Sequence, residues 1–211
     1  MIDRSKKLPA FFYQTSGGNE PVREWILELS PEDRKIIGRD IQKVEFGWPI
    51  GMPYCRSLGE GLWEVRSDLT DGKDRASDFL CRGRSHGVAA RFHQEDAEDA
   101  GARFAGRAET YEGGVLMAQR KGRMGSSFDS FLAEQGILEE CEEQAIKQIL
   151  ADQIKAAMEK DHLTKSAMAE RMRTSRRALD RLLDPANTSV TLHTLQRAAA
   201  AVGRQLRLEL I

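Results

Sequence analysis

The sequence lacks paired cysteine motifs, an excess of either charge and any long apolar run. Its three cysteines lie far apart and form no CxxC pair, which suits a reducing compartment. Since 32 Lys and Arg residues balance 33 Asp and Glu residues, any nucleic-acid site has to be local. No apolar run approaches the roughly 20 residues of a bilayer span, and the amino terminus holds no apolar segment long enough for a signal peptide. We therefore expect a cytoplasmic protein that makes no membrane contact.

The length of 211 residues exceeds the usual single-domain size of roughly 100–150 residues, which favours two domains. The amino-terminal part has the pattern strand, helix, helix, strand. Apolar residues predict a strand over 9–14, and helical spacing predicts a helix over 20–29. A second helix is predicted to begin at Ser30, an N-cap residue that is followed by Pro31. Alternation over 61–68 predicts the closing strand.

Residues 74–116 break this pattern. Their glycines are interspersed with arginine, alanine and a cluster of acids, namely Glu95, Asp96, Glu98 and Asp99. A helical pattern around residues 94–109 has almost no apolar face beyond Phe104. We therefore predict an irregular, poorly ordered junction.

The carboxyl-terminal part has mainly helical patterns from Phe128 onward. Apolar spacing predicts a long helix, and capping residues mark three shorter ones. Alternating leucines after Gly203 predict a terminal strand. The expected elements are helices at 142–160, 164–172, 175–183 and 191–202 and a strand at 205–210.

The strongest motif is LTKSAMAERMRTSRRALDRLL at residues 163–183. It consists of two short helices with a tight connection, and Ala169 supplies the small residue that lets the helices cross closely. The predicted core between them consists of Met168, Met172, Leu179 and Leu182. The spacing resembles the phage-repressor (Cro/cI, XRE) type of helix-turn-helix. Arg173 departs from that pattern, because the turn position usually holds Gly.

Local charge supports DNA binding by this motif. Residues 160–183 hold seven basic and three acidic side chains in a chain that is nearly neutral. In a major groove, arginine can form bidentate bonds to guanine, and the candidates are Arg176, Arg177 and Arg181. Lys165 and Ser175 stand near helix N-termini, where they can contact phosphates. The alternative interpretation is that this basic face is merely solvated.

The resemblance extends beyond the motif. Residues 117–211, with MGSSFDSFLAEQGILEE before the long helix and DRLLDPANTSVTLHTLQRAAAAVGRQLRLEL after it, are similar to HigA-like antitoxins. The resemblance implies a homodimer that represses its own operon by binding operator DNA and that neutralises an intact cognate toxin.

Residues 10–73 resemble the HigB-like branch of the RelE/ParE toxins, most specifically in GMPYCRSLGEGLWEVRSDLTDGK. Such proteins cut messenger RNA on the ribosome without a metal. The resemblance implies that Arg56, Glu64 and Arg66 are the catalytic candidates, since arginine can bind phosphate and stabilise developing charge. The alternative interpretation is that Glu64 and Arg66 form a structural cross-strand ion pair.

The reading frame of the gene offers a reason for the irregular junction. After Lys73 the toxin family continues with a strand like IARVIFC and a basic stretch like HGFIKKTQKTP, whereas this chain reads DRASDFLC and later AARFHQEDAEDAG. Both family stretches are allowed if each codon is read one nucleotide later. We therefore hypothesise a one-nucleotide slip near Lys73 and Asp74 that joined the toxin to a downstream antitoxin. The slip predicts a lost strand and, because RNA binding needs basic residues, an inactive toxin.

Together these patterns predict an α+β protein: a truncated RelE-like α/β segment at 1–73, a frame-shifted linker at 74–116 and a HigA-like antitoxin at 117–211, all-helical apart from its terminal strand. The expected function is sequence-specific DNA binding by an antitoxin and transcriptional repressor. Two alternatives stay open, an mRNA endoribonuclease with its antitoxin in cis and an interaction module that binds an intact toxin. No metal or cofactor is expected, since His162 and His193 lack metal-ligand spacing.

Overall fold

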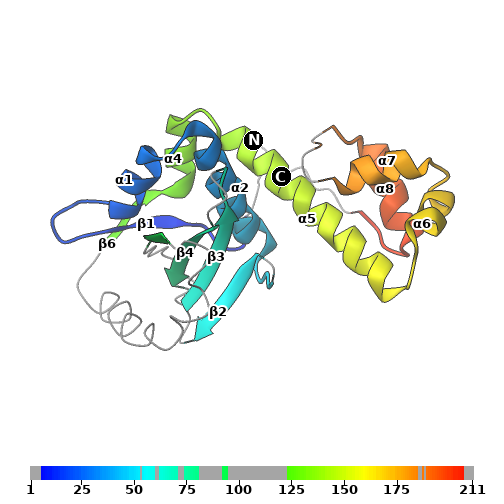
Figure 1. The fold of residues 1–211 in the computed structure, drawn as a ribbon, viewed down its shortest axis with the longest axis horizontal. Helices are drawn as coiled ribbons and strands as arrows, with labels where there is room; N and C mark the ends of the chain where they lie inside the picture. The colour runs from blue at the N-terminus through cyan, green and yellow to red at the C-terminus, as the bar shows by residue number, and fades with distance from the viewer. Residues whose placement is uncertain are drawn as a thin grey trace. The chain divides into compact units, whose positions relative to one another are not determined.

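A computed structural model of the chain describes residues 6–52, 54–59, 62–70, 74–80, 92–94, 123–184, 187 and 189–206. These residues form two compact units, an N-terminal unit over Lys6–Cys141 and a C-terminal unit that begins at Glu142. The predicted α+β class is confirmed, because the described residues contain seven helices and two small antiparallel sheets (Figure 1). The domain limits predicted at residues 73 and 116 lie outside the described residues.

The first elements of the N-terminal unit match the predictions closely. They are β1 (Phe11–Gln14), α1 (Pro21–Glu28) and α2 (Pro31–Gly47). Ser30 caps α2, because its hydroxyl accepts a hydrogen bond of 3.1 Å from the Asp33 amide. Asp33 in turn accepts from the amide and hydroxyl of Thr70, both at 2.9 Å. These hydrogen bonds link the first turn of α2 to the segment that follows β3 (Leu62–Asp68).

A four-stranded antiparallel sheet with the order β2-β3-β4-β5 follows, with β2 at Cys55–Gly59, β4 at Asp74–Leu80 and β5 at Phe92–Gln94. The predicted loss of a strand after Lys73 is wrong, because β4 pairs with all seven residues of β3. The hydrogen bonds between neighbouring strands are made by backbone atoms, so an irregular side-chain pattern does not prevent two strands from pairing.

One face of this sheet packs against α2. Val44 from the helix meets Cys55 and Val65 from the strands in a small core that also includes Leu8. At its edge the rings of Trp48 and Trp63 meet almost perpendicularly, with centroids 4.8 Å apart.

A second sheet joins residues from distant parts of the sequence. β6 (Arg123–Ser127) pairs antiparallel with β1, and Figure 1 shows the two strands side by side. Phe11 lies opposite Ser127, and the Phe128 amide donates a 3.0 Å hydrogen bond to the Ala10 carbonyl. β1 matches the strand predicted over 9–14, whereas β6 and its pairing with β1 are not apparent from the sequence pattern.

α4 (Phe128–Glu134) follows β6 directly and carries the largest apolar side chains of this region into the core of the N-terminal unit. The rings of Phe12, Phe128 and Phe131 form a triangle with centroid distances of 5.4, 5.6 and 5.9 Å. The buried core as a whole contains Ala10, Phe12, Val22, Ile26, Ile37, Ile41, Leu69, Phe128, Phe131, Leu132 and Cys141. Residues 123–141 therefore complete a core that begins at Ala10.

The C-terminal unit is helical among its described residues. α5 (Leu138–Lys160) is followed by α6 (Lys165–Arg171), α7 (Arg176–Leu183) and α8 (Leu192–Ala201), each close to its predicted position. The three short helices are capped by the hydroxyls of Thr164, Ser175 and Thr191. Most of the predicted terminal strand lies outside the described residues, and Gln205 and Leu206 belong to no strand.

Gly38→Val is predicted to destabilise the N-terminal unit, because a Cβ at this position would lie 2.9 Å from Cys141 Sγ and 3.0 Å from Leu132 Cδ2. Overpacking of a filled core typically costs about 1–3 kcal/mol. All three tryptophans lie in this unit, so urea unfolding of the full chain followed by tryptophan fluorescence reports its free energy of unfolding. Gly51→Val is the control, because nothing lies within 4 Å of a Cβ there. Equal values for the two variants would show that α2 does not approach α4 and α5 closely.

Candidate functional site

The two helices of the predicted motif cross over a shared apolar core. The predicted core side chains are all buried, with exposed fractions of at most 2% for Met168, Met172, Leu179 and Leu182. Ala169 lies in the same core and is 5% exposed, as the close crossing requires. α5 contributes Ile154, Ala157 and Met158, and α8 contributes Ala198. The two helices of the predicted motif therefore pack on a common apolar core.

The turn between α6 and α7 contains the unusual residue that the sequence indicates. Arg173 has a φ of +48°, in the left-handed region that favours glycine. The turn is closed by hydrogen bonds from the Arg173 amide to the Glu170 carbonyl at 2.8 Å and from the Thr174 amide to the Ala169 carbonyl at 2.9 Å. The Arg197 guanidinium on α8 donates to the Arg173 carbonyl at 2.5 Å. These contacts hold a backbone conformation that is unfavourable for arginine.

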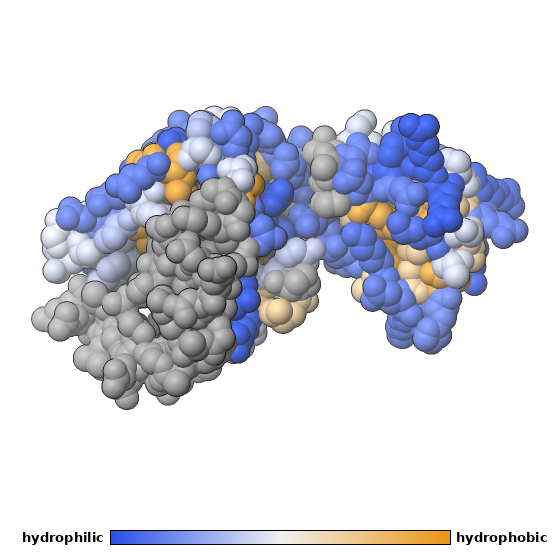
Figure 2. All heavy atoms as spheres, in the orientation of Figure 1, coloured by the Kyte–Doolittle hydropathy of each residue, from blue (hydrophilic) through white to orange (hydrophobic). Residues whose placement is uncertain are grey.

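α7 presents basic side chains on the side opposite its core. Leu179, Leu182 and Leu183 are buried, whereas the three predicted base-reading residues, Arg176, Arg177 and Arg181, are exposed. In the view of Figure 2 the surface over α6 and α7 is mainly hydrophilic. This division gives α7 one apolar face that packs in the core and one exposed face that is basic.

The two predicted phosphate contacts have partners of their own within the unit. Ser175 Oγ accepts from the Ala178 amide at 3.1 Å, so it serves as the cap of α7. Lys165 Nζ donates to Asp180 Oδ1 at 2.7 Å, and this hydrogen bond lowers the pKa of the Asp180 carboxyl. The side chains of Lys165 and Asp180 are 51% and 46% exposed. Because the pair lies at the surface, a stronger anion can compete for the ammonium group.

The candidates from the toxin resemblance meet on neighbouring strands. The Arg66 guanidinium donates to both carboxylate oxygens of Glu64, at 3.2 and 3.3 Å, and Arg56 on β2 lies opposite Glu64 in the sheet register. Glu64 and Arg66 do form an ion pair, but the expected cross-strand arrangement is wrong. Both residues belong to β3, where residues two apart point to the same face. Glu64 is 2% exposed, so the pair also satisfies a buried carboxylate.

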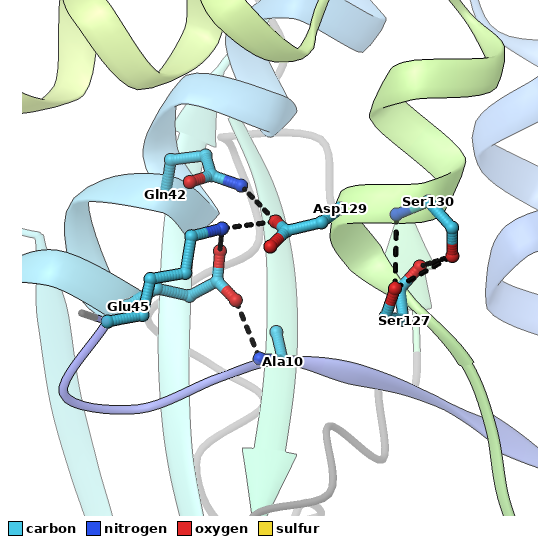
Figure 3. Close-up of polar contacts among 7 residues, drawn as sticks. Ala10, Gln42, Glu45, Ser127, Asp129 and Ser130 are labelled. Atoms are coloured by element: carbon cyan, nitrogen blue, oxygen red, sulfur yellow. Dashed lines mark hydrogen bonds and ion pairs between the residues drawn. The ribbon is translucent and has the colours of Figure 1, made fainter. Parts of the chain in front are cut away.

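A largely buried polar cluster that the sequence does not predict joins α2 to α4. Lys6 Nζ lies 2.9 Å from Glu45 Oε2 and also contacts Asp129 Oδ1, which accepts a 3.0 Å hydrogen bond from Gln42. Glu45 Oε1 accepts from the Ala10 amide at 2.6 Å (Figure 3). Burial raises the pKa of the Glu45 carboxyl from 4.5 to about 7, although the Lys6 charge lowers it. The cluster ties the chain before β1 to both helices.

Within the part of the chain that the structure describes, no three His, Cys, Asp or Glu side chains stand close enough together to hold a metal ion. His162 and His193 are exposed. None of the described helices has the length and apolar character needed to cross a membrane.

The raised pKa of Glu45 predicts that the N-terminal unit loses stability as the pH rises. Glu45 ionises near pH 4.5 in the unfolded chain and near 7 in the folded one, so its contribution is complete below 4.5 and lost by about pH 7. The expected loss is on the order of 3 kcal/mol. Urea unfolding at pH 4.5 and pH 7.5, followed by tryptophan fluorescence, should show this loss in the wild type and in the exposed control Glu24→Gln but not in Glu45→Gln. An unchanged pH dependence in Glu45→Gln would contradict it.

Comparison with known protein families found a match to part of the N-terminal unit. Residues 24–84 match the sequence profile of the family described as Phage derived protein Gp49-like (DUF891), a RelE/HigB-type toxin family that is associated with toxin–antitoxin systems. The match begins within α1, includes Arg56, Glu64 and Arg66, and continues past Lys73 through β4. No curated protein and no solved structure matches the chain. The N-terminal unit thus contains a segment similar to a toxin family.

Proposed function

We propose that this chain is a sequence-specific DNA-binding antitoxin and transcriptional repressor of a type II toxin–antitoxin operon, joined to an inactive toxin remnant. The observation that carries the proposal is the exposed arginine face of α7, a capped helix whose other face packs in the apolar core that it shares with α6. An α-helix fits the major groove, where arginine reads guanine through two hydrogen bonds. Arg176, Arg177 and Arg181 supply this chemistry from a helix whose other face is fixed by leucines.

Phosphate contacts are proposed to position α7 in the groove. Ser175 and Lys165 lie at the N-terminal ends of α7 and α6, where amide groups and the helix dipole favour an anion. On binding, the Lys165 ammonium would exchange the exposed Asp180 carboxylate for a phosphate. Such contacts give affinity without sequence information, and they make binding dependent on salt.

A homodimer on operator DNA is part of the proposal. A single helix-turn-helix makes few base contacts, and two copies gain specificity from half-sites about 34–36 Å apart. A palindromic operator in the DNA upstream of the gene is the target expected for such a dimer.

Two features support an inactive toxin-like segment. Arg66 is bound through two hydrogen bonds by Glu64, which reduces the positive charge available to RNA. In addition, the acids Glu95, Asp96, Glu98 and Asp99 stand where the resemblance to the toxins implies a basic stretch. Acidic residues repel the RNA backbone, so this replacement disfavours cleavage. The hypothesis of a slip near Lys73 concerns the gene and stays a prediction.

The alternative function is an mRNA endoribonuclease of the RelE/HigB type with its antitoxin in cis. It is favoured by the family match over residues 24–84, which includes all three sheet candidates. Cleavage of messenger RNA on ribosomes by the full chain, abolished by Arg66→Ala, would establish this activity in place of an inactive remnant.

Arg176→Ala or Arg177→Ala is predicted to weaken operator binding by about 1–3 kcal/mol, or about 5–150-fold, because each substitution removes a base contact. Gel shifts with the full chain and the DNA upstream of its gene measure the affinity at a fixed salt concentration. Arg204→Ala is the matched control, since Arg204 is exposed in the same unit but lies outside α6 and α7. If all three variants bind the DNA with the affinity of the wild type, α7 is not part of the DNA interface.

A further inference from the structure

Residues 123–141 have the contacts of a docked segment. This docking segment comprises β6, α4 and the first turn of α5. It packs on what we call the receptor surface, formed by Lys6, Ala10, β1, Glu20, α1 and α2. Twenty-eight residues of sequence separate Gln94, the end of β5, from Arg123, the start of β6. The contacts are therefore long-range in sequence, although they lie within one unit.

The apolar part of this contact resembles the centre of a protein interface. Phe131 and Leu132 are fully buried, and Phe128 is 3% exposed. Their partners on the receptor surface include Phe12 and Ile37. A few large side chains buried at the centre usually supply most of the energy of an interface.

Backbone pairing adds a second layer to the contact. Among the described residues, β6 is the only strand that pairs with β1. Without β6, the hydrogen-bonding groups of β1 would be unpaired along both edges, a state that invites pairing with another strand. Gly125 permits the approach, because a Cβ there would meet the Glu20 carboxylate and lie 3.0 Å from the Phe12 carbonyl oxygen.

The charges of the two sides are complementary. In three ion pairs the base comes from the receptor surface and the acid from the docking segment, namely Lys6–Asp129, Arg23–Glu134 and Lys35–Glu140. Glu20 accepts from the amide of Ser126 at 2.6 Å and from its hydroxyl at 2.7 Å. Arg34 donates to Gln135 at 2.8 Å while it also binds the carbonyls of Leu27 and Leu29. Charge complementarity of this kind specifies one partner and one register.

We propose that the receptor surface and the docking segment are a protein–protein interface enclosed in one chain, so that the internal copy excludes a separate protein that carries the same segment. The competing partner to which the surface is fitted is a second chain bearing residues 123–141, as a separately made copy of residues 117–211 would. Because the internal segment belongs to the same chain, its binding is intramolecular, and covalent linkage can give an effective concentration in the millimolar range. A competitor at micromolar concentration is therefore excluded about 100-fold or more. The proposal does not depend on DNA binding.

A fluorescent peptide of residues 123–141 tests the exclusion. We expect the peptide to bind the full chain carrying Phe131→Ala or Gly125→Val at least about 100-fold more tightly than it binds the wild-type chain. Phe131→Ala removes a central apolar contact, whereas Gly125→Val blocks β6 and leaves the phenylalanine core intact. Fluorescence anisotropy measures binding. A peptide with Gly125→Val is the negative control, and one with Glu139→Gln, at an exposed position, should bind like the parent.

A second measurement tests the exclusion of a competing segment even if both chain variants fail to fold. A specific protease site is inserted at residue 108 of the otherwise wild-type chain, and the purified protein is cut there. The two pieces are expected to co-elute in gel filtration and to separate when the parent peptide is added in excess. Separation of the pieces without peptide, or equal binding of the peptide to the intact wild-type chain and to a folded variant, would overturn the proposal.

Discussion

The contact between Phe12 on β1 and the two phenylalanines of α4 is the interaction on which the N-terminal unit depends. Burial of each such side chain contributes about 1.5–3 kcal/mol, and the edge and tilted ring contacts add to it. Once the rings meet, β6 lies along β1 and Asp129 reaches Lys6 and Gln42. Residues that follow the toxin-like segment in sequence are thus part of the same folded unit.

The C-terminal unit is stabilised differently, because its helices are capped and packed mainly by residues that are near in sequence. Each of its three short helices begins with a hydroxyl cap, and the left-handed turn at Arg173 is held by α6 and by Arg197. The leucine face of α7 is directed into this core, which fixes the arginine face outward. A rigid base of this kind is what a helix needs in order to read DNA by position.

Local patterns in the sequence were sufficient for six of the seven described helices and for β1 and β3, but not for α4, the other strands or the buried polar contacts. Ser30 followed by Pro31, and the cap Ser175, mark helix starts because capping involves neighbouring residues. β6, with the sequence RMGSS, has no alternating apolar pattern and is held by its pairing with β1 and by the hydrogen bonds of Ser126 to Glu20. The contact of Glu45 with Lys6 spans 39 residues, so no local spacing reveals it. The ion pair of Glu64 and Arg66 was foreseeable because residues two apart share a face of a strand.

Hydrogen exchange of the full chain tests the central claim, that residues 123–141 are an integral part of the N-terminal unit. The decisive amides are those of Ser126 and Phe128, which donate to Glu20 and to the Ala10 carbonyl. The account predicts that they exchange as slowly as the interior amides of α2, through the same cooperative unfolding. Exchange of these two amides at the rate of an unstructured peptide, while α2 remains protected, would contradict it.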